Sequence, residues 1–208
     1  GWAGKLAPAA QDYLLVVDTN VGYNKVSANV EQSIDYDVTL SPEGPRARLT
    51  VRYTNHSAVT EEECNKFTQY VPTYEQMMEG CYWDYVRVYV PQGAQLVSAT
   101  GGDKEATAID ELGRTVFDTT LLLRPGESRE LSFEYRLPST VIQGDTYALI
   151  AQKQAGTEAL PLTVSVAWPE GSLRETTGMA PEKTEPHRAQ FHTDLSVDRQ
   201  LEMRFGAR

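Results

Sequence analysis

The sequence predicts an all-β protein: an immunoglobulin-like antiparallel β-sandwich with a short helical insertion, followed by a smaller C-terminal β-rich part. The first observation is strict alternation of apolar and polar residues, clearest over residues 129–138, which is typical of strands with one buried face. The second is the Pro- and Gly-containing turns between such stretches, as in residues 124–128. The third is a hydrophobic content of 40% in 208 residues, enough to fill the core of one large β domain or two small ones.

The alternating stretches divide the chain into three regions. Residues 1–32 contain a strand over 13–17 and a connector. Residues 33–138 contain the helical insertion and about seven strands, the number that an immunoglobulin-like sandwich requires. Residues 139–208 contain about four more strands, and form either a second small module or a part packed on the first as one unit. Within that last region, residues 171–188 are predicted to be a long, mobile polar loop.

Hairpins are predicted where a short turn separates two alternating stretches, because antiparallel neighbours need only a tight connection. Each predicted hairpin would place its two strands side by side in one sheet. The predicted pairs join residues 34–40 to 48–53, 116–123 to 129–137, and 191–195 to 201–205.

The first hairpin carries acidic residues on one outer strand and basic residues on the other. Asp35 and Asp37 share a polar face, opposite Arg48 and Arg52. Strand rise places the two carboxylates about 7 Å apart, a separation compatible with an inverting glycosidase pair. The favoured interpretation is a solvated face with cross-strand ion pairs, because neither carboxylate has the apolar surroundings that would raise the pKa of a catalytic acid.

Residues 57–83 interrupt the strand pattern and predict a short helical insertion. Residues 60–63 and 73–76 both match the capping box that begins a helix. The only two cysteines, Cys64 and Cys81, flank most of this segment. We expect a disulfide between them, which would stabilise the fold by about 3 kcal/mol through chain entropy and indicate an extracytoplasmic location. The alternative is two separate buried thiols.

The next strand has a marked difference between its two faces. If its valines face the core, an aromatic stripe with one arginine lies on the other face. That stripe is either covered by the helical insertion or exposed as a binding platform for a glycan or a partner protein. The valines are Val86, Val88 and Val90, and the candidate platform is Trp83, Tyr85, Arg87 and Tyr89.

A weaker candidate for a metal site follows the first strand. Asp18, Asn20 and Asn24 could supply oxygen ligands for calcium from a loop. The spacing of an EF-hand is absent, however, and Asp and Asn are common in loops for conformational reasons. A loop without a metal is therefore the favoured interpretation.

No motif points to catalysis. The three histidines, His56, His187 and His192, lie in no recognisable nucleophile setting, and we expect them on the surface or in structural roles. No glycine-rich stretch has the strand-to-helix context of a phosphate-binding loop. The sequence therefore predicts a non-enzymatic protein without a cofactor.

Charge and hydropathy exclude further classes. The chain has 19 Lys and Arg against 29 Asp and Glu, a net charge of −10, which would repel nucleic acid. No apolar run approaches the roughly 20 residues of a membrane helix, so we expect this fragment itself to be soluble.

Three segments together resemble a bacterial family of large membrane-anchored proteins, common in Chloroflexi, whose function is unknown. They are residues 13–25, residues 81–91 and residues 152–157. The resemblance implies an extracytoplasmic position near the C-terminal end of a membrane-anchored parent, and it implies no catalytic residues. We therefore expect a cell-surface module for adhesion, assembly or scaffolding. Alternatives are a carbohydrate-binding module that uses the aromatic stripe and an accessory domain of an enzyme encoded upstream.

Overall fold

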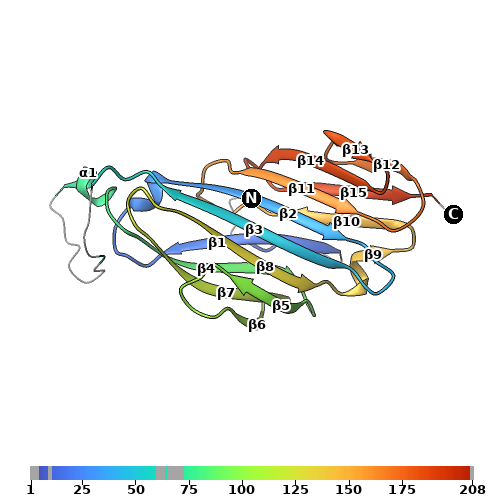
Figure 1. Ribbon diagram of the computed structural model, residues 1–208, viewed down its shortest axis with the longest axis horizontal. Helices are drawn as coiled ribbons and strands as arrows, with labels where there is room; N and C mark the ends of the chain where they lie inside the picture. Colours follow the sequence, from blue (N-terminus) through green and yellow to red (C-terminus); the bar gives the residue numbers. More distant parts are fainter. Residues whose placement is uncertain (1–4, 9–10, 60–63, 65–72, 207–208) are drawn as a thin grey trace.

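The computed structural model describes residues 5–8, 11–59, 64 and 73–206, and its strands form two sheets that pack face to face (Figure 1). The first sheet contains, in spatial order, β12 (Leu173–Thr177), β15 (Arg199–Phe205), β10 (Thr146–Ala151), β1 (Asp12–Asn20), β4 (Tyr82–Pro91), β7 (Arg114–Leu123) and β6 (Thr107–Glu111), with β9 (Ile142–Gln143) beside β10. The second contains β13 (Lys183–Glu185), β14 (Arg188–Asp194), β11 (Pro161–Ala167), β2 (Val30–Thr39), β3 (Arg46–Asn55), β8 (Ser128–Arg136) and β5 (Gln95–Thr100).

The predicted all-β sandwich is confirmed, with one difference in strand direction. Each sheet is mixed rather than wholly antiparallel, because β1 pairs with β10 in parallel and β2 pairs with β11 in parallel. Alternation of apolar and polar residues reports which side of a strand is buried, not the direction of its neighbour. The two parallel pairings were therefore not predictable from the residue pattern.

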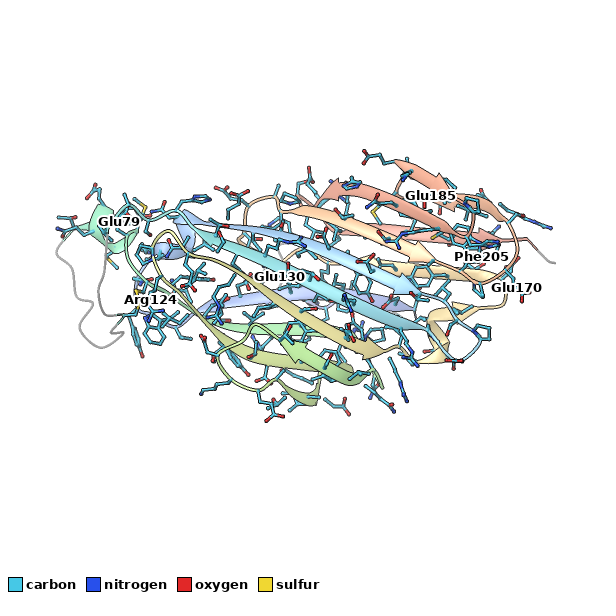
Figure 2. The ribbon with its side chains drawn as sticks, in the orientation of Figure 1. Glu79, Arg124, Glu130, Glu170, Glu185 and Phe205 are labelled. Carbon is cyan, nitrogen blue, oxygen red and sulfur yellow. A yellow bond between two sulfur atoms is a disulfide. The ribbon has the colours of Figure 1, made fainter. Side chains whose placement is uncertain are left out.

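The apolar core lies between the two sheets. Phe117 of β7 packs against Phe133 and Tyr135 of β8, with ring centroids 6.4 Å and 5.2 Å apart. These side chains are almost completely buried and belong to one continuous cluster that also includes Tyr147 and Phe191. Strands from residues 139–208 thus extend both sheets and contribute to the same core, while charged side chains such as Glu130 and Glu185 lie on the outside (Figure 2).

One of the three predicted hairpins forms. β2 and β3 pair over their whole length. The other two predictions are wrong, because β7 and β8 lie in different sheets, as do β14 and β15. The turn at Pro125 and Gly126 carries the chain from one sheet to the other, and Asn55 at the end of β3 holds it there through backbone hydrogen bonds to Gly126 and Glu127.

The strand count is higher than the sequence indicated. Fifteen strands occur in the described residues, against about eleven predicted from alternation. The segment 171–188, predicted to be a loop, contains β12 and β13 at the sheet edges. These short strands are mostly exposed on both sides, so they carry no alternation to detect.

The helical insertion is only partly described. Residues 60–63, the first predicted capping box, and residues 65–72 lie outside the described residues. A short helix, α1 (Tyr74–Met77), lies at one end of the long axis (Figure 1), and its cap is as predicted: Thr73 Oγ1 accepts from the Gln76 N–H at 3.3 Å. The predicted disulfide between Cys64 and Cys81 is present, with Cα atoms 5.8 Å apart.

Short 3-10 turns, η1 (Val26–Asn29) and η2 (Ser139–Val141), are the remaining helical elements of the described residues. Within those residues, none of the helices has the length and apolar character needed to cross a membrane.

Candidate functional site

The candidate platform of β4 lies on the outer face of the first sheet, as the alternation predicted, and Val86, Val88 and Val90 lie in the core. It is not an open aromatic row. Tyr89 is only 4% exposed, while Trp83, Tyr85 and Arg87 are half-buried.

The platform residues contact one another and their neighbours. The Arg87 guanidinium lies 5.9 Å and 5.6 Å from the ring centroids of Tyr85 and Tyr89, respectively, and 3.7 Å from Glu111. Tyr89 also packs into a second apolar cluster with Tyr13 and Leu15. Leu6 and Ala7, near the N-terminus, pack against this second cluster.

One sequence-based prediction was that the helical insertion covers the aromatic stripe. Its described part bonds to the segment after β1, where the Lys25 N–H donates to the Met77 carbonyl at 2.7 Å and Asn29 donates to the Met78 carbonyl at 2.8 Å. Among the described residues, it is N-terminal chain at Leu6 and Ala7 that packs against the cluster containing Tyr89.

The three calcium candidates belong to two different settings. Asn20 donates to Asn24 Oδ1 at 2.8 Å, and its own Oδ1 accepts from the Gly22 N–H at 2.8 Å. These contacts close the turn after β1. Asp18 lies in β1 itself rather than in a loop, and its Oδ1 accepts from the Tyr53 hydroxyl at 2.7 Å. No group of three or more His, Cys, Asp or Glu able to hold a metal occurs in the part of the chain that the structure describes.

The inner face of β1 begins and ends with a carboxyl group. Leu14 and Val16 of this face belong to the core, whereas Tyr13 and Leu15 belong to the outer cluster. By the same alternation, Asp12 and Asp18 face inward. Each receives a hydrogen bond from a tyrosine of the opposite sheet: Asp12 from Tyr36 and Asp18 from Tyr53.

Asp12 is completely buried within a cluster of tyrosines. Tyr147 donates to its Oδ2 at 2.7 Å and Tyr36 donates to the same atom at 2.9 Å. The Tyr135 hydroxyl lies behind them and donates to Tyr36 at 3.2 Å. Burial raises the pKa of Asp12 to about 6, although the hydrogen bonds favour its charged form.

Asp18 forms a buried carboxyl pair with Asp84 of β4. Asp84 is 1% exposed, and its carboxyl group interacts with the Asp18 carboxyl group, the Thr19 backbone and the Tyr82 hydroxyl. Burial, and then the negative charge of Asp18, raises the pKa of Asp84 to about 9. Burial also raises the pKa of Asp18, opposed by the hydrogen bond from Tyr53. At neutral pH the two carboxyl groups therefore retain a proton between them.

A window opens between the two sheets beside this pair. β10 leaves β1 at the pair Leu14–Ala151, and β11 joins β2 only from the pair Ile34–Leu162. The later residues of β1 and the first residues of β2 therefore have no β10 or β11 beside them. The connection between β10 and β11 passes over this gap.

A pocket of about 860 Å³ fills the window. Its inner end is made by the buried side chains Gln32, Tyr53 and Tyr82 together with Asp18. The rim is formed by the exposed Glu31 and by the connecting segment 154–161, whose residues are exposed or half-buried. The volume is within the range typical of small-molecule sites, about 300–1,000 Å³.

Gln154 takes the place of a strand partner at this edge. Its Oε1 accepts from the Asp18 N–H at 2.9 Å and its Nε2 donates to the Asp18 carbonyl at 2.9 Å. Lys153 holds the connecting segment closed by donating to Thr157 Oγ1 at 2.9 Å. The backbone beside the pocket is thus satisfied without closing the window.

The other sequence candidates lie away from the pocket or at its rim. Asp35 pairs with Arg52, while Asp37 pairs with Arg188 of β14 at 3.0 Å, on an exposed face. His56 lies at the pocket rim.

The three histidines are exposed. His56 lies 2.9 Å from Glu31, and His192 lies 3.5 Å from Glu182. His187 lies at the edge of the Trp168 ring, with centroids 6.3 Å apart.

Sequence reasoning did not identify Asp84, Tyr82 or Asp12. The signal for the first two was present, because the alternation that places Val86 in the core also places Asp84 and Tyr82 on the same inner face. A carboxyl group on an otherwise apolar face is itself an indication of a special role. Asp12 precedes an apolar run, so its burial depended on knowing where β1 begins.

The chain matches no protein-family model and no curated protein. Among solved structures, it is similar to a protein from Legionella pneumophila described as a candidate nutrient binding protein, with 8% identity and a TM-score of 0.50 over 93% of this chain and 70% of that one. It is also similar to an M1 zinc metallopeptidase from Deinococcus radiodurans, with 12% identity and a TM-score of 0.43 over 85% of this chain. The chain spans 42% of that peptidase. At these identities the likeness concerns the fold alone.

Proposed function

We propose that this chain is a non-catalytic binding module of an extracytoplasmic protein, and that a small polar ligand occupies the pocket between β1 and β2. The observation that carries the proposal is a pocket of about 860 Å³ whose inner end presents Asp18, with the buried, protonated Asp84 behind it. Burial of charged groups costs stability, and such groups concentrate where a protein binds or transforms a ligand.

Binding is favoured over catalysis by the position of the two carboxyl groups. Asp18 lines the pocket, whereas Asp84 lies behind it and is not among the lining residues. A catalytic carboxyl pair needs both groups within reach of the reacting atoms. Asp84 therefore acts on a ligand through Asp18, by setting its charge.

The location and the wider role rest on other features. The Cys64–Cys81 disulfide supports an oxidising, extracytoplasmic compartment, and the family resemblance supports a membrane-anchored parent at the cell surface. There the module would serve adhesion, assembly or scaffolding, or assist an enzyme encoded upstream. Its partner is an unidentified protein or glycan.

The aromatic stripe is a weaker basis for binding a glycan than the pocket. A sugar ring stacks on an open aromatic face, but Tyr89 is buried and Arg87 lies beside the rings of Tyr85 and Tyr89. The pocket, in contrast, is open to solvent along the window.

The test is a thermal-melting screen of small amines, sugars, amino acids and carboxylic acids at millimolar concentration. A compound present at 100 times its dissociation constant would stabilise the protein by about 2.7 kcal/mol, a rise in Tm of about 5–10 °C for a chain of this size. The same compounds are then tested on Ala159→Trp, which places a large side chain at the pocket rim, and on Ala108→Trp, an exposed position of β6 away from the pocket.

The proposal expects at least one compound to raise Tm in the wild type and in Ala108→Trp, but not in Ala159→Trp. It is overturned if no compound raises Tm, or if the stabilising compounds act equally on Ala159→Trp.

A further inference from the structure

The pocket has an acidic lining. Asp18, Glu31 and Glu158 contribute carboxylates, and neither Lys nor Arg is among the lining residues within the described parts of the chain. His56 is the one imidazole, and it lies 2.9 Å from Glu31. The rim therefore adds negative charge in front of Asp18, and the net charge of −10 gives the whole surface the same sign.

Asp84 is a second and independent observation. It lies on the inner face of β4 beside Tyr82, which lines the pocket, and close enough to Asp18 for each to shift the pKa of the other. Both of its oxygens are buried, and the groups that interact with them are the Asp18 carboxyl group, the Thr19 backbone and the Tyr82 hydroxyl. Two buried carboxyl groups in contact disfavour each other's charged form, so a positive group placed against Asp18 would be stabilised by both.

We propose that the ligand of this pocket is a small organic cation with an ammonium group, which binds at the inner end against Asp18; this inference rests on the proposed function and specifies its ligand class. An ammonium group brings three N–H donors and no acceptor. The acceptors at the inner end include the Asp18 carboxyl group, the Gln32 amide oxygen and the hydroxyl oxygens of Tyr53 and Tyr82.

An organic cation fits this pocket better than a metal ion. The volume of about 860 Å³ accommodates a molecule with an aliphatic or polar body. Calcium requires six to eight oxygen ligands, whereas the inner end offers one carboxyl group directly. A metal-sized cluster of ligands is absent from the described residues.

Binding of a cation would be linked to release of a proton. With no ligand, Asp84 keeps a proton at neutral pH, because burial and the charge of Asp18 raise its pKa to about 9. A bound ammonium group replaces that proton as the compensating positive charge, so the Asp84 O–H bond breaks and the proton passes to the buffer. The other groups facing the pair are neutral at this pH: Tyr53 and Tyr82, whose pKa values burial raises, and the amide of Gln32.

The charged side chains at the rim are separate from the buried pair. Glu31 and His56 lie at the solvent-exposed mouth together with Glu158. A substitution at Asp84 leaves these exposed groups unchanged. Proton release that is lost in the Asp84→Asn variant is therefore assigned to the buried pair and not to the rim.

The experiment is isothermal titration calorimetry with three probes of similar length: 1,4-diaminobutane, 1,4-butanediol and succinate. Each is titrated into the wild type, Asp18→Asn and Asp84→Asn between pH 6.5 and 8.5, where an alkyl ammonium group (pKa about 10.4) stays charged. Two buffers of different ionisation enthalpy report the number of protons released. Calcium chloride alone is a fourth titrant, and circular dichroism confirms that each variant is folded.

The inference expects the diamine to bind the wild type with proton release and with an affinity that rises with pH. Asp18→Asn should weaken binding about 10- to 100-fold, as loss of a charged hydrogen bond does. Asp84→Asn should bind the diamine without releasing a proton. If Asp18→Asn does not fold, the proton release and its loss in Asp84→Asn remain as the test.

Four results would overturn the inference: the diol or succinate binding as tightly as the diamine, diamine binding that is unchanged in Asp18→Asn, calcium alone occupying the site in an Asp18-dependent way, or no binding of the diamine. If a neutral or anionic compound binds in a manner that Ala159→Trp blocks, the ligand class is wrong but the proposed binding function stands.

Discussion

Replacing Asp12 by Asn should remove a pH dependence that this one buried carboxyl group imposes on stability. Asp12 is completely buried, with hydrogen bonds from Tyr36 and Tyr147. Its pKa is raised from 3.8 to about 6 in the folded protein, chiefly by burial. Asparagine has nearly the same shape and can still accept a hydrogen bond from a tyrosine, but it does not titrate.

The sign and size of this pH dependence follow from the protons that Asp12 binds in the folded and unfolded states. A raised pKa means that the folded state holds the proton more tightly than the unfolded state does. The contribution of Asp12 to stability is therefore complete below about pH 4 and is lost as the pH rises through about 6. A shift of about 2 pKa units corresponds to about 3 kcal/mol, of which about 2 kcal/mol should fall between pH 4.5 and 7.5.

The assay is urea unfolding of the wild type and Asp12→Asn at several pH values in this range. The free energy of unfolding of the wild type, minus that of the variant, should decrease by about 2 kcal/mol as the pH rises. All other titrating groups are shared by the two proteins and cancel. Asp37→Asn is the control, since Asp37 forms an exposed ion pair with Arg188. The free energy of unfolding of the wild type, minus that of Asp37→Asn, should change by less than about 1 kcal/mol over the same pH range.

A difference that stays constant with pH would refute the reasoning. So would a difference that increases with pH, since the hydrogen bonds from Tyr36 and Tyr147 would then outweigh the cost of burial and hold Asp12 charged.

Three further predictions concern other parts of the structure. Asp84→Asn should remove the loss of stability that the wild type shows between about pH 4 and about pH 9, measured by urea unfolding, because the pKa of Asp84 is raised from 3.8 to about 9. The double variant Cys64→Ser, Cys81→Ser should be less stable by about 3 kcal/mol in the same assay. Gly101→Ala should lower the free energy of unfolding, in the same assay, by more than Gly126→Ala, for which a loss of about 1–2 kcal/mol is expected. Both glycines have positive φ, but only at Gly101 would the added carbon collide with the backbone of β8.

Residue alternation was sufficient to predict the fold class and the faces of the main strands. Val86, Val88 and Val90 lie in the core as expected, and the strands around Asp35 and Arg52 pair as predicted. These elements have one buried side and one exposed side, so their hydrophobic pattern has the period of a strand.

Sheet membership was not predictable in the same way. The turn at Gly126 has the composition of a hairpin turn, but its position is set by hydrogen bonds to Asn55, a residue of another strand. Alternation also gives no signal for β12 and β13, whose side chains face solvent on both sides. Such strands exist because a neighbouring edge is available for pairing.

The pocket lay beyond sequence reasoning for a related reason. Asp18 was identified as a polar residue, but its association with Asp84 depends on β1 pairing with β4. The opening depends on β10 pairing with β1 only as far as Leu14 and on β11 pairing with β2 only from Ile34. Neither of these registers is encoded locally, whereas the position of Asp84 on a valine face could have been noticed.

The two parallel pairings have a consequence for how the protein is made. β1 pairs with β10 and β2 pairs with β11, and both partners lie in the last third of the chain. Neither sheet can therefore be completed until most of the chain has been synthesised. Contacts between such distant segments slow folding. A nascent or truncated chain that stops at residue 138 would leave β1 and β2 with bare hydrogen-bonding edges, which are templates for aggregation. Efficient folding of this chain should therefore depend on keeping it from aggregating until its last strands are available.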